Sequence, residues 1–140
     1  MSVPVWMLLG FATWTLLLLM FTVGTYRWSH ILSGRRQISG FRADPIDEAD
    51  WYKRATRAHA NCIENLPVFG AIVVALHIAN ISSQLCDALA VSILVARVAQ
   101  SLVHVGFVQT NAAVSLRFSL YCVQAVGFLG LIGAVVMSAG

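Results

Sequence analysis

The chain has 140 residues, of which 59% are hydrophobic and only 11% are charged. A soluble globular domain carries about 25% charged residues, so this composition excludes that class and indicates an integral membrane protein. The formal net charge of +3 suits an anionic leaflet or an anionic ligand, and the sequence contains no sign of a nucleic-acid-binding module.

Four long apolar runs predict four membrane-spanning helices, because about 20 apolar residues cross the hydrocarbon core of a bilayer. We expect these helices near 4–27, 54–80, 86–108 and 114–137, within one domain that covers residues 1–140. The first run lacks the basic start and the cleavage site of a signal peptide. The short second and third connections place consecutive helices antiparallel, so the expected fold is an all-α, up-down-up-down four-helix bundle.

The first connection, residues 29–51, is the only long polar segment. Seven of the nine basic residues lie in or beside it. The positive-inside rule therefore predicts that the first and third connections are cytoplasmic and that both termini lie outside an inner, cytoplasmic membrane. The connection itself has two interpretations. It is a solvated loop that fixes the topology, or a cover that supplies Arg35 or Arg36 to a ligand.

The second expected helix begins with a polar stripe. Arg57, Asn61 and Glu64 are spaced i, i+4 and i+7, which places them on one helix face. Ionisable side chains entering an apolar helix are costly in lipid, so such a face usually meets a partner, a cavity or a substrate. Four acidic residues before this helix are candidate partners of Arg57: Asp44, Asp47, Glu48 and Asp50.

The third expected helix carries a second polar face, with Arg97, Gln100, Ser101 and His104 at helical spacing. At 1.5 Å rise per residue, Glu64 and Arg97 reach a similar depth, which predicts a structural ion pair between the two helices. His104 is either a satisfied structural histidine or an acid–base and hydrogen-bonding group of a site.

The fourth expected helix offers Arg117, Tyr121 and Gln124 at i, i+4 and i+7, in the same half of the membrane. Arg117 has no acidic partner nearby. It either extends to the lipid headgroups or receives a carboxylate or phosphate. Tyr121 is either an ordinary tyrosine of the bundle core or a hydroxyl donor to the same anion.

Metal binding is not expected, because no set of histidine, cysteine and carboxylate side chains has zinc spacing. Cys62, Cys86 and Cys122 lie in expected helices and show no CxxC pattern. We expect them to be free cysteines that pack as small hydrophobic side chains.

The segment RAHANCIENLPVF, from Arg57 to Phe69, resembles the signature of the MAPEG family, the membrane-associated proteins in eicosanoid and glutathione metabolism. Further parts of the chain are similar to the family as well. They are the segment around Arg97, the pair Arg117 and Tyr121, and the sequence FRADP before the second helix. The match at FRADP aligns Arg35 with the arginine of the family's first helix.

This resemblance implies a homotrimer that holds bent glutathione at its subunit interfaces, open to the cytoplasmic half of the membrane. It implies that Arg35 and Arg57 bind the carboxylates, and that Asn61 and Glu64 contact the polar backbone and the amine. Arg117 would be the catalytic residue that stabilises the thiolate, and Tyr121 would stack on the tripeptide or donate to it. We add His104 to the binding residues because it shares the polar face.

The leading hypothesis is a glutathione-dependent transferase or peroxidase that acts on hydrophobic or lipid electrophiles from the bilayer. The alternative is a non-catalytic lipid-binding or scaffolding trimer, since one member of the family binds lipid without catalysis. A channel or transporter subunit is disfavoured by the lack of internal repeats. The branch that isomerises prostaglandins differs from this chain at Ala60, Gln100, His104 and Phe118, so that chemistry is not expected.

Overall fold

The computed structural model describes residues 1–43 and 45–140, and every regular element in them is helical. The elements are α1 (Val3–Leu18), the π-helical η1 (Leu19–Gly24), α2 (Thr25–Leu32), the short 3-10 helix η2 (Ile38–Gly40), α3 (Asp50–Ile78), α4 (Gln84–Gly106) and α5 (Asn111–Ala139). Because α1, η1 and α2 are continuous, the structure has four helices long and apolar enough to cross a membrane. The prediction of an all-α fold with four spans is confirmed.

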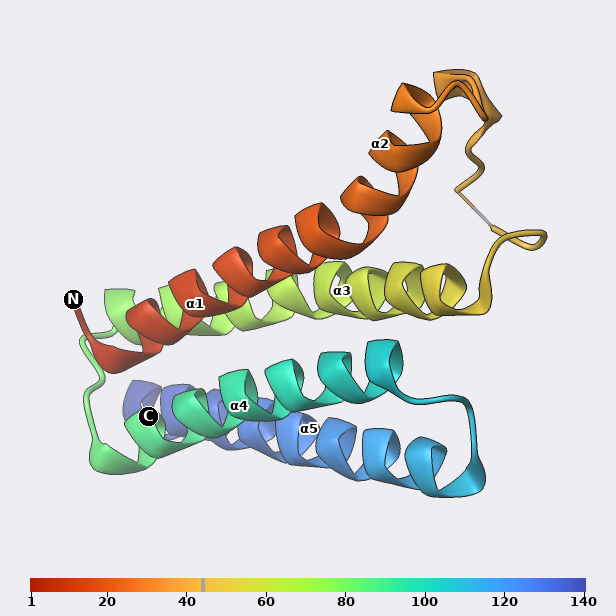
Figure 1. Ribbon diagram of the computed structural model, residues 1–140. Helices are drawn as coiled ribbons and strands as arrows, with labels where there is room; N and C mark the ends of the chain where they lie inside the picture. Colours follow the sequence, from red (N-terminus) through yellow and green to blue (C-terminus); the bar gives the residue numbers. More distant parts are fainter. Residues whose placement is uncertain (44) are drawn as a thin grey trace.

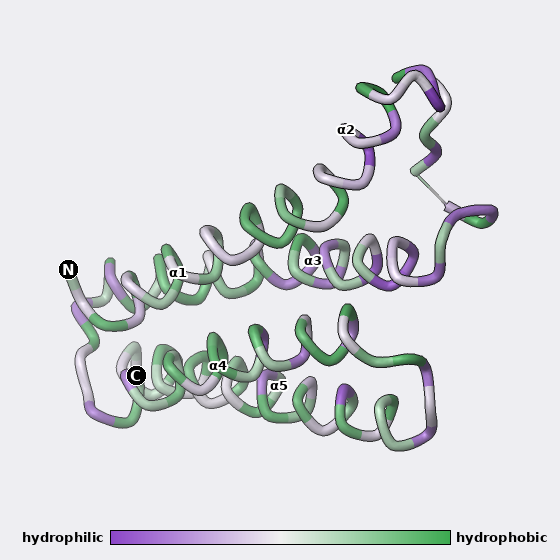
Figure 2. The backbone as a smooth tube through the Cα atoms, in the orientation of Figure 1, coloured by the Kyte–Doolittle hydropathy of each residue, from purple (hydrophilic) through white to green (hydrophobic). Residues whose placement is uncertain are grey.

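The four spans run antiparallel in chain order, so both termini lie at the same end of the molecule (Figure 1). Helix α4 packs against α1, α3 and α5, and α3 likewise contacts the other three spans. The hydropathy colouring in Figure 2 shows apolar helices and a hydrophilic segment that runs from α2 into the first turns of α3. Polar side chains therefore gather at the end opposite the termini.

Local sequence signals define the starts of α4 and α5. The Ser83 hydroxyl accepts a hydrogen bond from the Cys86 backbone N–H at 3.1 Å, and the Thr110 hydroxyl accepts one from that of Ala113 at 3.2 Å. Both are N-caps, which satisfy backbone donors that the helix leaves free. Helix α3 ends where Asn80 adopts a left-handed backbone with φ of +53°, a conformation that asparagine tolerates at helix ends.

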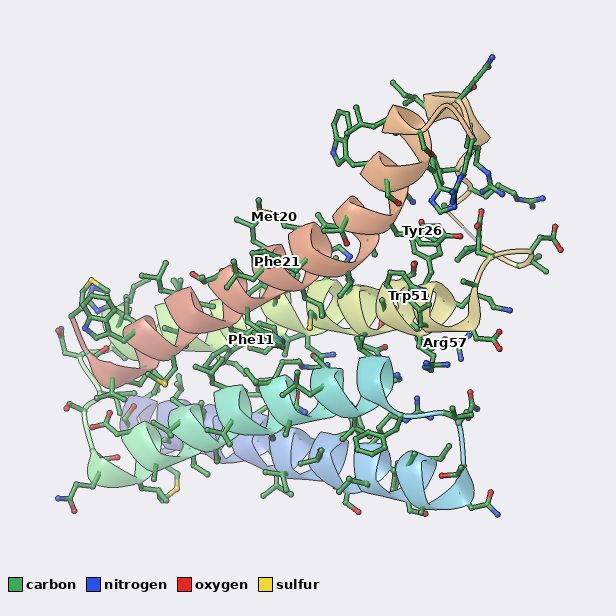
Figure 3. The ribbon with its side chains drawn as sticks, viewed as in Figure 1. Phe11, Met20, Phe21, Tyr26, Trp51 and Arg57 are labelled. Carbon is green, nitrogen blue, oxygen red and sulfur yellow. The ribbon has the colours of Figure 1, made fainter. Side chains whose placement is uncertain are left out.

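The first span is longer than the sequence predicts, and α3 begins earlier. The first span continues to Leu32 instead of ending near 27, and α3 begins at Asp50 instead of near 54. Tyr26 of α2 contacts the segment in which α3 begins. Its ring stacks on Tyr52 with 4.1 Å between ring centres and meets Trp51 edge-on at 5.3 Å. Figure 3 shows Tyr26 beside Trp51. Its hydroxyl also donates to the Glu48 carboxylate at 2.7 Å. These contacts fix the start of α3.

The core of the bundle is built on aromatic and small residues. Phe69 of α3 contacts Phe11 of α1 and Phe128 of α5, with ring centres 5.8 and 6.0 Å apart. Gly127 lets α5 approach α4 closely, since a Cβ atom there would lie 2.7 Å from the Ile93 side chain. The tight α4–α5 contact sets the position of the polar residues at the start of α5.

Candidate functional site

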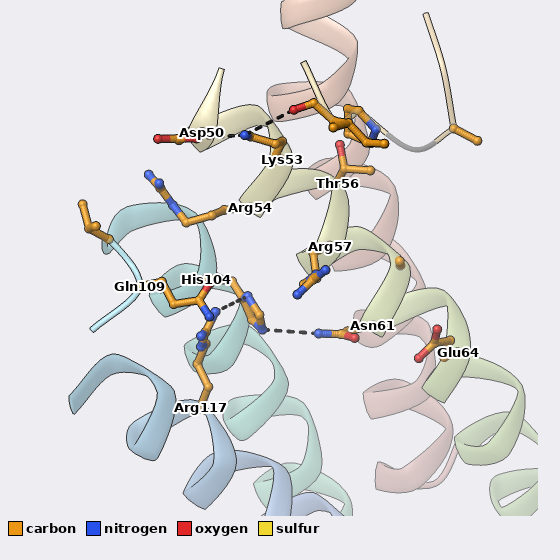
Figure 4. Close-up of a pocket in the computed structure, with 15 residues that line it drawn as sticks. Asp50, Lys53, Arg54, Thr56, Arg57, Asn61, Glu64, His104, Gln109 and Arg117 are labelled. Carbon is orange, nitrogen blue, oxygen red and sulfur yellow. Dashed lines mark hydrogen bonds and ion pairs between the residues drawn. The ribbon is translucent and has the colours of Figure 1, made fainter. Parts of the chain in front are cut away.

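A cavity of about 920 Å³ opens at the end of the bundle where the first and third connections lie (Figure 4). Its size falls within the range of roughly 300–1,000 Å³ that is usual for small-molecule sites. The residues that line it come from the first connection, α3, α4, the third connection and α5: Ala43, Pro45, Ile46, Asp50, Lys53, Arg54, Thr56, Arg57, Ala60, Asn61, Glu64, His104, Val108, Gln109 and Arg117.

Positive charge predominates in the cavity lining, where four lysine or arginine side chains face two carboxylates. One carboxylate is already engaged, because Asp50 pairs with Lys53 at 3.0 Å. In the described part of the chain, no salt bridge involves Arg57, Arg117 or Glu64. Guanidinium groups in such a surplus are suited to carboxylate or phosphate, which they bind through two parallel N–H donors.

The structure brings together five of the residues singled out from the sequence. Arg57, Asn61 and Glu64 of α3, His104 of α4 and Arg117 of α5 all line the cavity. The helical spacing of the α3 residues explains why they share a face. Arg57 and Glu64 are exposed to the cavity, whereas Asn61 and Arg117 are partly buried.

His104 connects the two sides of the cavity. Nη1 of Arg117 lies 2.8 Å from Nδ1 of His104, and the amide nitrogen of Asn61 lies 3.3 Å from Nε2 of the same ring. Figure 4 shows the three side chains in line across α3, α4 and α5. The imidazole is 6% exposed, so the protein fixes its orientation.

The expected ion pair between Glu64 and Arg97 is not formed. The salt bridges within residues 1–43 and 45–140 join Arg36 to Glu48 and Lys53 to Asp50. Arg97 is 1% exposed and lies over the ring of Phe11, with 5.5 Å between its guanidinium carbon and the ring centre. Similar depth in the membrane does not ensure that two side chains meet, and the guanidinium of Arg97 is turned toward Phe11 of α1. Glu64 instead lines the cavity as an exposed carboxylate.

Arg35 and Tyr121 do not line the cavity of this single chain. Arg35 is exposed in the first connection, and Tyr121 is 46% exposed on the surface of α5. Arg36 is held by Glu48, so neither arginine of the proposed cover reaches the cavity. The wall that this connection does supply is formed by Ala43, Pro45 and Ile46.

Among the proposed acidic partners of Arg57, none forms an ion pair with it in the described residues. Asp44 lies outside those residues. Cys62, Cys86 and Cys122 are all free cysteines, as predicted. Cys62 and Cys86 are also buried as expected, whereas Cys122 is exposed on α5, so the expectation of burial is wrong for Cys122.

Sequence reasoning missed several lining residues and one supporting contact. Arg54 lies one helical turn before Arg57, and that spacing could have identified it. Gln109 lies in a connection and carries no such signal. The contact is a buried amide pair in which Gln124 donates to Gln100 at 3.0 Å. Gln100 in turn donates to the backbone carbonyl of Arg117 at 3.1 Å, which ties α4 to the cavity end of α5.

Four helices long enough to cross a membrane and a cavity lined by a surplus of cationic side chains place this chain in the class of small integral membrane proteins with a polar site at one end of the bundle. A model of the MAPEG family matches residues 3–137, and the chain belongs to this family. No curated protein and no solved structure matches the chain. Membership in the MAPEG family supports a general role in glutathione-related or eicosanoid metabolism at a membrane. The family includes glutathione transferases and related enzymes as well as non-enzymatic members.

Proposed function

We propose that the cavity binds glutathione or a thiol of similar charge, and that the protein uses its thiolate against hydrophobic electrophiles. One observation carries the proposal: Arg57 of α3 and Arg117 of α5 line the same cavity, and neither forms a salt bridge in the described residues. Glutathione has two carboxylates and one ammonium group. A cavity with surplus guanidinium and one free carboxylate, that of Glu64, complements this charge pattern.

The proposed roles are those that the resemblance to the family implies, and the presence of these side chains in one cavity supports them. Arg57, exposed near the mouth, binds a carboxylate, while Asn61 and Glu64 bind the peptide backbone and the ammonium group. Arg117 lies at the opposite wall and stabilises the thiolate. A cation beside sulfur favours the ionised thiol, which is the form that reacts.

The chemistry of a bound thiolate accounts for both proposed activities. In a transferase reaction, the sulfur forms a bond to an electrophilic carbon, and a leaving group departs or a proton adds to the product. In a peroxidase reaction, the sulfur attacks a hydroperoxide, the O–O bond breaks and an alcohol leaves. The resulting sulfenic acid condenses with a second thiol to give a disulfide and water. The cavity contributes by holding the reactants together.

The proposal includes a homotrimer in an inner, cytoplasmic membrane, with the first and third connections on the cytoplasmic side. Arg35 and Tyr121 are exposed in the single chain, as expected of side chains that serve a neighbouring copy. A hydrophobic electrophile would enter from lipid between the first span of one copy and the last span of its neighbour, and would meet the thiolate at the interface.

The test is equilibrium binding of glutathione to purified protein, followed by the ultraviolet absorbance of the thiolate. We expect wild-type protein to show the signal and Arg117→Ala to lose it. Arg42→Ala is the matched control, because Arg42 is an exposed arginine of the first connection that does not line the cavity. The enzyme proposal fails if wild type shows no thiolate at saturating glutathione.

A second candidate function is lipid binding without catalysis. It is favoured by an apolar groove of about 370 Å³ on the surface between α1 and α4, lined by Trp6, Leu9, Gly10, Thr13, Trp14, Leu17, Leu94 and Val98. This function predicts bound lipid in the purified protein and no thiolate signal with glutathione. The absorbance experiment therefore separates the two candidates.

A further inference from the structure

Asn61, His104 and Arg117 form a chain of polar contacts across three helices (Figure 4). His104 stands in the middle, and each of its ring nitrogens meets one neighbour. An imidazole can donate or accept at either nitrogen, so the identity of the neighbours determines where its proton lies.

The contact with Arg117 determines whether Nδ1 of His104 carries a proton. A guanidinium has only N–H donors and cannot accept a hydrogen bond. Nη1 of Arg117 lies 2.8 Å from Nδ1 of His104, so Nδ1 must be the acceptor and carries no proton. A neutral imidazole with a free Nδ1 holds its single proton on Nε2.

The second nitrogen then decides the orientation of Asn61. Nε2–H is a donor, and it faces the side-chain amide of Asn61 at 3.3 Å. The two ends of an amide have nearly the same shape, and the hydrogen-bond network assigns them. The amide oxygen of Asn61 therefore accepts from Nε2–H, and its NH₂ group turns away from the ring.

The surroundings hold this arrangement in place. His104 is 6% exposed, and the Arg117 backbone carbonyl accepts a hydrogen bond from Gln100. The backbone of Arg117 is thus held by Gln100 of α4, and one N–H of its guanidinium is held by His104. Within residues 1–43 and 45–140, the guanidinium makes no other hydrogen bond, which leaves its remaining N–H groups to a ligand in the cavity that it lines.

The geometry points to His104 as a positioning residue that fixes the Arg117 guanidinium at the sulfur site and turns the Asn61 amide donor toward the bound peptide. This role rests on the proposed function, because it assigns how the thiolate-stabilising cation is held. His104 acts through its two neighbours and takes no part in bond making. This positioning role differs from the direct binding of the ligand that the sequence suggested for His104.

The tautomer can be measured without any ligand. In protein labelled with ¹⁵N at histidine, we expect His104 to show a protonated Nε2 and an unprotonated Nδ1. His30 is an internal contrast, because its Nδ1 lies 2.8 Å from the Tyr26 carbonyl oxygen and must be the protonated nitrogen. Arg117→Ala should change the Nδ1 resonance of His104. A protonated Nδ1 on His104 overturns the assignment.

Two variants separate positioning from simple packing. His104→Asn keeps an acceptor atom at the place of Nδ1, and His104→Gln instead keeps a polar atom at the place of Nε2. We expect His104→Gln to lower the thiolate signal of bound glutathione by about tenfold, the loss of one hydrogen bond to a charged group. His104→Asn should recover most of the signal. Equal loss in both variants, or no loss in either, overturns the positioning role.

The two measurements also distinguish this inference from the proposed function. Wild-type protein that shows the thiolate signal together with a protonated Nδ1 overturns the positioning role alone. Wild-type protein without the signal overturns the proposed function, and the role of His104 in it, even when Nδ1 is unprotonated.

Discussion

The guanidinium of Arg97 lies over the ring of Phe11, 5.5 Å from its centre, where α4 meets α1 inside the bundle. Its Nε and Nη2 atoms are buried and have no hydrogen-bond partner among the described residues. A cation over an aromatic face gains about 2 kcal/mol when both are removed from water. Removing a charge from water costs several kcal/mol, so the ring offsets only part of the cost.

We therefore expect Arg97→Met to leave the bundle as stable as wild type or more stable, because methionine fills the space without a buried charge. Arg97→Ala is the control. It removes the charge and also leaves a cavity, with an expected loss of about 2–5 kcal/mol. Thermal unfolding in detergent measures both. A methionine variant as unstable as the alanine variant would contradict the prediction.

Gly127 tests the close approach of α5 to α4. A Cβ atom at this position would lie 2.7 Å from Cγ1 and 3.0 Å from Cδ1 of Ile93, so Gly127→Ala should cost about 1–3 kcal/mol. Gly133 lies on the same helix, and a Cβ atom there would meet nothing within 4 Å. Gly133→Ala should therefore not destabilise the protein. Equal unfolding temperatures for the two variants would rule out this packing.

The buried pair Gln100 and Gln124 allows a double-mutant test. Gln124 is fully buried and donates to Gln100 at 3.0 Å. Changing either residue to leucine leaves the side-chain amide of the other without this partner, which lowers the free energy of unfolding by about 1–3 kcal/mol. The double leucine variant should lose less than the sum of the single changes, because no orphaned amide remains. Strict additivity in denaturant unfolding would show that the two amides do not interact.

The proposed homotrimer makes a prediction about Arg35. Arg57→Ala should weaken glutathione binding about tenfold, since it removes a charge-assisted contact. Arg35→Ala should weaken it as well, because Arg35 would serve the site of a neighbouring copy. Arg42→Ala, an exposed change in the same connection, serves as the control. Isothermal titration measures all three, and an unchanged dissociation constant for Arg35→Ala would show that this arginine is no part of the site.

Composition and periodicity predicted most of the architecture. A run of about 20 apolar residues crosses the bilayer as a helix, which satisfies its own backbone hydrogen bonds, so four such runs imply four spans. The helical repeat alone likewise places Arg57, Asn61 and Glu64 on one face. Both inferences depend only on hydrophobicity and residue spacing within one segment, and these can be read directly from the sequence.

The rotation of each helix about its axis was decided only by tertiary packing. Depth along the membrane follows from counting residues, and depth alone predicts that Glu64 and Arg97 form a pair. Whether two side chains point toward each other depends on which faces the helices bury, and Arg97 lies against Phe11 instead. The contact of Arg117 with His104 arises in the same way, from the packing of α5 on α4. The amino-acid sequence determined what crosses the membrane and which polar groups share a depth, and the tertiary structure decided which of them meet.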